Sequence, residues 1–257
     1  MLFGCTCKPE EYEIASQTGF DYIEFPCRII CGMEEVIFSA LNKQVDRIGT
    51  PVIGMNLYCP PELIISGPGY DAEKVLLYAK TAAARGSALG VNIVGIGSPR
   101  SRILPDGFDQ KTAKSQLTEF LLITAAQFDR VNITVAMEAL GPCFCNFINT
   151  VPEAYEIVNA ANKNNLKIVA DFYNMEHSGE ADNDLTAYMD KLVHMHISDD
   201  DGSPTLRSFL KPEKYPIHKP RIRRLIETGY NGGLTIETDI PFDDARAGES
   251  LQFLKSV

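Results

Sequence analysis

The chain has 257 residues, which is enough for one domain of ordinary size or two smaller ones. Hydrophobic residues make up 45% and charged residues 23%, values that are typical of a globular enzyme. The formal net charge of −10 argues against a nucleic-acid-binding protein, because such proteins usually carry a basic face.

Short apolar runs alternate with longer amphipathic segments along the whole chain, without a linker or a break in composition. The predicted strands are 2–7, 21–25, 52–57, 92–97, 132–138, 167–171, 192–197 and 233–238. The predicted helices are 9–18, 33–47, 71–89, 109–129, 151–163, 183–190, 218–228 and 243–255. Strands that alternate with helices pair in parallel, so this order predicts an α/β fold, a single (β/α)8 TIM barrel over 1–257. An open doubly wound sheet is the alternative, but no GxGxxG motif follows the first strand.

Residues typical of helix ends support these boundaries. Gly19, Gly90 and Gly229 each follow a predicted helix, at the position where a left-handed residue commonly ends it. Thr150 precedes the helix predicted at 151–163, and Glu153 stands three residues later, as in a capping box. The strand–helix count therefore does not depend on hydrophobic periodicity alone.

The composition also constrains partners and location. Basic residues are concentrated only at 218–224, which we interpret as the start of a solvated helix because no aromatic residues are interleaved for base stacking. No run approaches the roughly 20 apolar residues of a membrane span, and no signal sequence is recognisable. We expect a cytoplasmic protein that binds a small molecule, and we expect it to bind neither nucleic acid nor a membrane.

The seven cysteines are odd in number and suggest reduced thiols. Two Cys-x-Cys pairs, at 5/7 and 143/145, have the wrong spacing for a standard zinc knuckle. On a strand, residues two apart point to the same side. We therefore interpret both pairs as small apolar fillers.

Four predicted strands end in a polar residue on the same face. In 132–138, Glu138 shares a face with the small residues Thr134 and Ala136, while the opposite face is apolar. The same alternation leaves Asp171, His196 and Glu237 as the last inward residues of the sixth, seventh and eighth strands. The C-terminal ends of barrel strands carry the active site in enzymes of this fold.

Three converging carboxylates repel one another unless a cation lies between them. Three oxygen ligands and one imidazole suit a divalent metal, namely Mn²⁺, Mg²⁺, Co²⁺ or Zn²⁺. We therefore predict one metal ion bound by Glu138, Asp171, His196 and Glu237, with Mn²⁺ favoured.

Several motifs, in this order and spacing, resemble the xylose isomerase-like barrels of sugar and sugar-phosphate isomerases and epimerases, including the ketose 3-epimerases. They are GFDYIE at 19–24, GIGSPRSR at 95–102, PDGF at 105–108, AME at 136–138, NTVPEA at 149–154, ADFYNM at 170–175, HMHISD at 194–199 and GYNGGLTIE at 229–237. The resemblance implies the same metal ligands, with Glu138 and Glu237 as acid and base on opposite faces of a ketose. Related barrels often form dimers or tetramers, which leaves a homo-oligomer open.

The chain departs from the epimerase pattern at two places. Asn174 stands where the family often has a His, three residues after the metal-binding Asp. The segment 141–145 reads GPCFC and is uncharged, where the ketose 3-epimerases carry an Arg and a Glu. Asn174 can still donate a hydrogen bond to a substrate hydroxyl, but it cannot relay a proton.

Other residues are candidate substrate contacts. Arg100 follows the fourth predicted strand and is suited to a phosphate or a carboxylate, with a salt bridge as the alternative. Glu24 ends the second strand facing inward, where it contacts substrate or forms a structural hydrogen bond. His194 lies one layer below His196 and is assigned to orienting a ligand.

Three remaining polar features are assigned to the surface. We expect the acidic triplet 199–201 in a solvated loop, with Asp199 close enough in sequence to lie beside the site. We expect His177 and His218 to be exposed.

Four function classes follow. The first is a metal-dependent sugar or sugar-phosphate isomerase or epimerase, and the second is a metal-dependent dehydratase or lyase acting on an inosose-like ketone. The third, an abasic-site endonuclease, predicts several zinc ions held by many His residues and a basic groove, whereas this chain has 4 His and a net charge of −10. The fourth is a barrel that binds a ligand or works with a partner but has little catalysis of its own.

Overall fold

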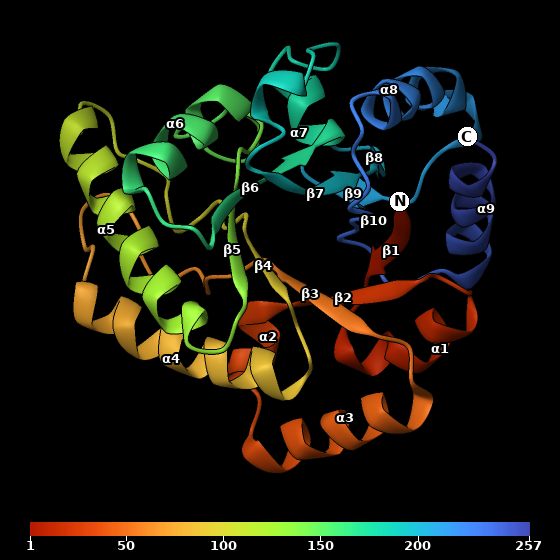
Figure 1. The fold of residues 1–257 in the computed structure, drawn as a ribbon, viewed down its shortest axis with the longest axis horizontal. Coiled ribbons are helices and arrows are strands. Elements are labelled where there is room, and N and C mark those ends of the chain that lie inside the picture. The colour runs from red at the N-terminus through yellow and green to blue at the C-terminus, as the bar shows by residue number, and fades with distance from the viewer.

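Eight parallel strands close into a barrel in the computed structural model, which describes residues 1–257 (Figure 1). The order around the barrel is β1-β10-β7-β6-β5-β4-β3-β2, so the first and last strands are neighbours. The strands are β1 Leu2–Thr6, β2 Tyr22–Pro26, β3 Val52–Asn56, β4 Ile93–Ile96, β5 Thr134–Glu138, β6 Leu166–Asp171, β7 Leu192–Ile197 and β10 Gly233–Ile236. The predicted barrel is confirmed, and each strand lies within two residues of its expected range.

Helices surround the strands (Figure 1). They are α1 Tyr12–Gln17, α2 Cys27–Gly32, α3 Glu35–Ile48, α4 Ala72–Ala88, α5 Gln110–Asp129, α6 Val151–Ala161, α7 Phe172–His177, α8 Tyr215–Glu227 and α9 Asp244–Lys255. The predicted capping box is present, since Thr150 accepts from the Glu153 amide and Glu153 accepts from the Thr150 amide. Gly19 and Gly229 have φ of 89° and 84°, the left-handed conformation expected after a helix end.

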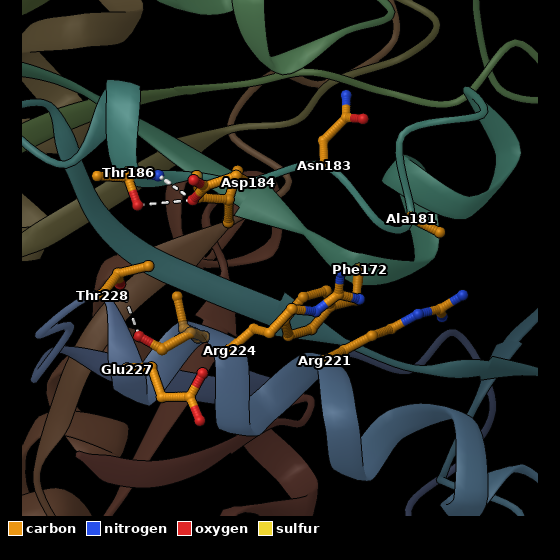
Figure 2. Close-up of a pocket in the computed structure, with 11 residues that line it drawn as sticks. Phe172, Ala181, Asn183, Asp184, Thr186, Arg221, Arg224, Glu227 and Thr228 are labelled. Atoms are coloured by element: carbon orange, nitrogen blue, oxygen red, sulfur yellow. Dashed lines mark hydrogen bonds between the residues drawn. The ribbon is translucent and has the colours of Figure 1, made fainter.

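The predicted helix at 183–190 is wrong. Only a 3₁₀ turn, Thr186–Tyr188, occurs there. The Asp184 carboxylate accepts hydrogen bonds from the amide and the hydroxyl of Thr186, and this local turn competes with a helix (Figure 2). The helix of this unit is the short α7, which begins directly at the strand end because Asp171 accepts from the Tyr173 amide at 2.8 Å.

The segment after β7 contains an antiparallel pair that the sequence pattern did not predict. Its two-residue strands, β8 Asp199–Asp200 and β9 Arg207–Ser208, form a hairpin above the barrel mouth. The Arg207 amide donates to the Asp239 carboxylate, and the Asp239 amide donates back to the Arg207 carbonyl. The hairpin is therefore fixed to the segment that follows β10.

The basic helix is longer and more buried than predicted. It begins at Tyr215, and His218, Arg221, Ile222 and Leu225 form its buried face. The expectation of a surface His218 is wrong, because this side chain is 2% exposed and its Nε2 lies 3.1 Å from an oxygen of Asp199. Asp199 is 1% exposed, so it is not a solvated loop residue either. His177 is exposed, as predicted.

The apolar core divides into two parts. A large cluster fills the space between the strands and the helices, while a small one inside the barrel consists of Ile93, Ala136 and Val169. Most cysteines belong to the buried core, and only Cys143 is fully exposed. All seven are free. None of the helices is both long enough and apolar enough to cross a bilayer.

Candidate metal centre

Four side chains meet at the C-terminal end of the barrel. Glu138 and Asp171 are the last residues of β5 and β6, His196 lies near the end of β7, and Glu237 directly follows β10. These strands are neighbours in the order β10-β7-β6-β5, so residues far apart in sequence become adjacent. One ligand atom from each side chain lies within 4.8 Å of the others, and none of the four residues is more than 3% exposed. We call this set the carboxylate cluster.

The His196 ring is oriented for coordination. Its Nδ1 lies 3.1 Å from Glu237 Oε2 and 3.4 Å from Glu138 Oε1, and its Nε2 lies 3.3 Å from Glu24 Oε2. With the proton on Nε2 and donated to Glu24, the Nδ1 lone pair faces the carboxylates. The donor set of one imidazole and three carboxylates therefore fits a divalent metal.

A second polar layer lies beneath this cluster. Glu24 Oε1 lies 2.6 Å from His194 Nε2, and it also accepts from the Thr235 hydroxyl. The Thr235 hydroxyl in turn lies 2.7 Å from the Tyr22 hydroxyl. These contacts are at hydrogen-bond distance, and Glu24 connects this layer to His196, so the layer supports His196 from below.

This arrangement places three candidate substrate contacts, Glu24, His194 and Asn174, in buried hydrogen-bond networks. The structural hydrogen bond considered for Glu24 is present, and His194 reaches His196 through Glu24. Glu24 and His194 are 2% and 3% exposed, and neither lines the cavity above the carboxylate cluster. Asn174 is 2% exposed, and its amide is fully engaged. Its nitrogen donates to Asp171 Oδ2 at 3.0 Å and to Glu138 Oε1 at 3.2 Å, and its oxygen accepts from the Gly141 amide. Asn174 therefore positions two carboxylates.

Arg207, which the sequence pattern did not indicate, is the guanidinium that pairs with carboxylates of the cluster. Its Nη1 donates to Asp171 Oδ2 at 2.9 Å and also contacts Glu237 Oε2. The Phe144 ring lies 4.9 Å and the Tyr173 ring 5.8 Å from its guanidinium carbon. Arg207 stands ten positions after the end of β7, where no periodic pattern marks it.

Burial and charge separate the two carboxylates that contact Arg207. Burial raises the pKa of Asp171 to about 6, and repulsion from Glu138 and Glu237 adds to this effect although Arg207 opposes it. Burial also acts on Glu237, but Arg207 and His196 outweigh it and lower its pKa to about 2. For His196, burial opposes the charged form, while Glu237 and Glu24 raise its pKa above the usual value.

A cavity of about 490 Å³ opens above the carboxylate cluster. Glu237 and Arg207 reach it from below, and Arg28 and Arg100 line its outer part. Arg100 is exposed and has no salt bridge. Its predicted place at the barrel mouth therefore agrees with the structure. The cavity has the size of a small-molecule site.

Another cavity, of about 330 Å³, lies between the 181–186 segment and α8 (Figure 2). Arg221 and Arg224 lie on one side of it. Arg224 pairs with Asp182 and Arg221 pairs with Glu176, so both guanidinium groups have structural partners. No residue of the carboxylate cluster lines this cavity.

The family model described as "Xylose isomerase-like TIM barrel" matches residues 12–257. The chain belongs to this family. Within the family, a curated relative is the inosose isomerase of Halalkalibacterium halodurans, 27% identical over 141 residues. That alignment covers 50% of this chain and 49% of the relative, so the chain spans about half the length of the curated relative that it matches.

Solved xylose isomerase-like barrels share the fold over the full chain. A D-psicose 3-epimerase from Clostridium cellulolyticum H10, solved with D-tagatose, has a TM-score of 0.77 at 16% identity, covering 100% of this chain and 99% of that chain. The 3-keto-D-glucoside 4-epimerase of E. coli has a TM-score of 0.76 at 19% identity and covers 100% of both chains. These TM-scores show a common fold.

Gly97 of this xylose isomerase-like barrel is a sensitive position, because a Cβ there would collide with Glu138 Oε2. We expect Gly97→Ala to displace Glu138 and to lower both metal affinity and any turnover, the latter on the order of 100-fold. Gly95→Ala is the matched control: Gly95 lies two residues earlier, within β4, and its Cβ would meet its nearest atoms at 3.9 Å. Metal titration of both purified variants tests this; equal affinities would show that Glu138 tolerates the displacement.

Proposed function

We propose that this chain is a metal-dependent isomerase or epimerase acting on a sugar or a sugar phosphate. The observation that carries the proposal is the pair of buried glutamates, Glu138 and Glu237, within one ligand cluster, of which Glu237 lines a cavity of small-molecule size. The names of the relatives, which are carbohydrate isomerases and epimerases, support the reaction class.

The residues that would hold the metal are Glu138, Asp171, His196 and Glu237. A divalent metal bound there would polarise a substrate carbonyl and its neighbouring hydroxyl, which acidifies the C–H bond between them. One glutamate removes this proton, and the other returns a proton to the opposite face of the carbon. Asn56 donates to Glu237 Oε1 at 2.9 Å and so fixes the carboxylate plane.

Metal analysis followed by proton exchange tests the proposal. The purified protein is analysed for bound divalent metals, among which Mn²⁺ is expected. Ketoses and their phosphates are then incubated with it in D₂O. The expected result is deuterium incorporation next to the carbonyl of at least one ketose, with or without net conversion. A metal-loaded protein that exchanges no ketose would favour a ligand-binding barrel with little catalysis.

A dehydratase or lyase acting on an inosose-like ketone is the second candidate. The H. halodurans relative is named inosose isomerase, and this name supports an inosose-like ligand without deciding between the two reactions. The same proton abstraction would precede loss of a β-hydroxyl group as water instead of reprotonation. Mass spectrometry of the product distinguishes the two reactions. Dehydration lowers the mass by about 18 units, the mass of one water molecule, whereas epimerisation leaves it unchanged.

Arg100 is proposed to bind the distal end of the substrate, because it lines the cavity and has no carboxylate partner. We expect Arg100→Ala to raise the KM for a phosphorylated ketose about 10- to 100-fold, the worth of a hydrogen bond to a charged group, with little change for the unphosphorylated sugar. Arg130→Ala, at an exposed arginine outside the cavity, is the control. If KM changed equally for the phosphorylated and the unphosphorylated sugar, Arg100 would not contact the phosphate.

A further inference from the structure

The charge balance of the carboxylate cluster depends on Arg207. This side chain is 5% exposed, lies against the Phe144 and Tyr173 rings, and comes from the β8–β9 hairpin. A single nitrogen, Nη1, contacts one oxygen of Asp171 and one oxygen of Glu237. Two of the four candidate ligands are therefore already bound to a cation that the chain itself supplies.

We propose that Arg207 is the resident cation of the metal-free site and competes with the divalent metal for Asp171 and Glu237. This inference rests on the proposed metal-dependent function. It makes Arg207 a determinant of metal affinity, a property that the ligand set alone does not specify.

The hydrogen bonds that Asp171 already accepts support competition between Arg207 and the metal for this carboxylate. Asp171 Oδ1 accepts from the Tyr173 amide at 2.8 Å. Asp171 Oδ2 accepts from both Asn174 Nδ2, at 3.0 Å, and Arg207 Nη1, at 2.9 Å. A carboxylate oxygen offers about two lone-pair sites, so Oδ2 has none left for a metal while both donors remain, and Asp171 then offers a metal only the second site of Oδ1.

Arg207 is the donor that can leave. The Asn174 amide is held from its other side by the Gly141 amide and lies within α7, directly beside Asp171. Arg207 reaches the cluster through a long flexible side chain, and it also lines the open cavity, into which it can withdraw.

The charges of the site also support competition between Arg207 and a divalent metal. Without a metal, Glu138, Asp171 and Glu237 are buried together, and Arg207 offsets their repulsion together with His196. A divalent ion between the same carboxylates would lie close to the guanidinium and would be repelled by it. Metal binding therefore includes the loss or weakening of two ion pairs.

The test measures Mn²⁺ affinity by calorimetry and the melting temperature of the metal-free protein. Arg207→Met removes the charge and keeps most of the side-chain length, whereas Arg207→Lys keeps the charge. We expect Arg207→Met to bind Mn²⁺ at least about tenfold more tightly than the wild type, because the competing cation is gone, and to melt at a lower temperature without metal. Arg207→Lys should bind Mn²⁺ within a few-fold of the wild type.

Arg221→Met is the matched control. Arg221 is also buried and paired with one carboxylate, Glu176, at 2.7 Å, but it does not contact the cluster. It should lower the melting temperature without changing Mn²⁺ affinity. If Arg207→Met does not fold, Arg207→Gln supplies a second neutral variant with a polar end.

The outcomes are distinct. Weaker Mn²⁺ binding by the neutral variant would overturn the inference and would make Arg207 a supporting donor, whose loss typically costs 10- to 100-fold in affinity. Unchanged binding would overturn it as well. If neither the wild type nor the neutral variant binds Mn²⁺, Mg²⁺, Co²⁺ or Zn²⁺, the proposed function fails together with the inference. Binding by the neutral variant alone would support the inference.

Discussion

The Glu237→Gln variant is expected to lose proton exchange from one of two epimers and to keep it from the other. In the proposed reaction each glutamate serves one face of the same carbon, so Glu138 continues to exchange the proton on its own face. The loss should be on the order of 10³-fold, within the usual contribution of a positioned general base. The measurement is deuterium uptake in D₂O, started separately from each member of the ketose pair that the wild type interconverts.

The reciprocal variant and the metal content control for other effects. Glu138→Gln should lose exchange from the opposite epimer, which a general loss of structure cannot produce. Both variants are assayed with saturating Mn²⁺ and analysed for bound metal, because each residue is also a candidate ligand. Unchanged turnover of Glu237→Gln, or equal loss from both epimers with the metal still bound, would exclude the two-base mechanism.

Replacing His196 is expected to abolish retention of the metal. His196 is the only nitrogen ligand of the cluster, and its ring is held from below by Glu24 at 3.3 Å. Loss of a supporting partner alone typically costs 10- to 100-fold in metal affinity, so loss of the ligand itself should exceed about 100-fold. We expect His196→Ala to contain less than about a tenth of the wild-type metal after dialysis, as measured by elemental analysis.

His218 offers a matched control for this experiment. It is also a buried histidine paired with a carboxylate, at 3.1 Å from Asp199, but it lies outside the cluster. His218→Ala should lower the melting temperature and retain the metal. If both variants keep the wild-type metal content, the ion is not bound by His196.

The strands and the cluster could be predicted from local alternation. Strand residues face opposite sides in turn, so small and polar residues on one face of 134–138 already distinguish the barrel interior from its surface. Glu138, Asp171, His196 and Glu237 each end such a pattern. Their convergence then follows from barrel closure alone, which brings four parallel strand ends to one rim.

The remaining features depend on contacts between distant segments. Arg207 reaches the cluster because Asp239 anchors the β8–β9 hairpin, a pairing that no local pattern encodes. His218 is buried because it meets Asp199, 19 residues earlier. The sequence left two roles open for Glu24, because alternation gives the face of a strand residue but not the layer at which its side chain lies; the structure has the structural hydrogen bond.

The position of Glu237 after β10 also sets the order in which the protein can be assembled. A nascent chain that lacks β10 already contains Glu138, Asp171 and His196, but it has neither Glu237 nor the Thr235 hydroxyl that contacts Glu24. Complete ion binding therefore belongs to the last stage of folding. An ion held in part by Glu237 would then join the end of β10 to the ends of β5, β6 and β7 and stabilise the closed barrel.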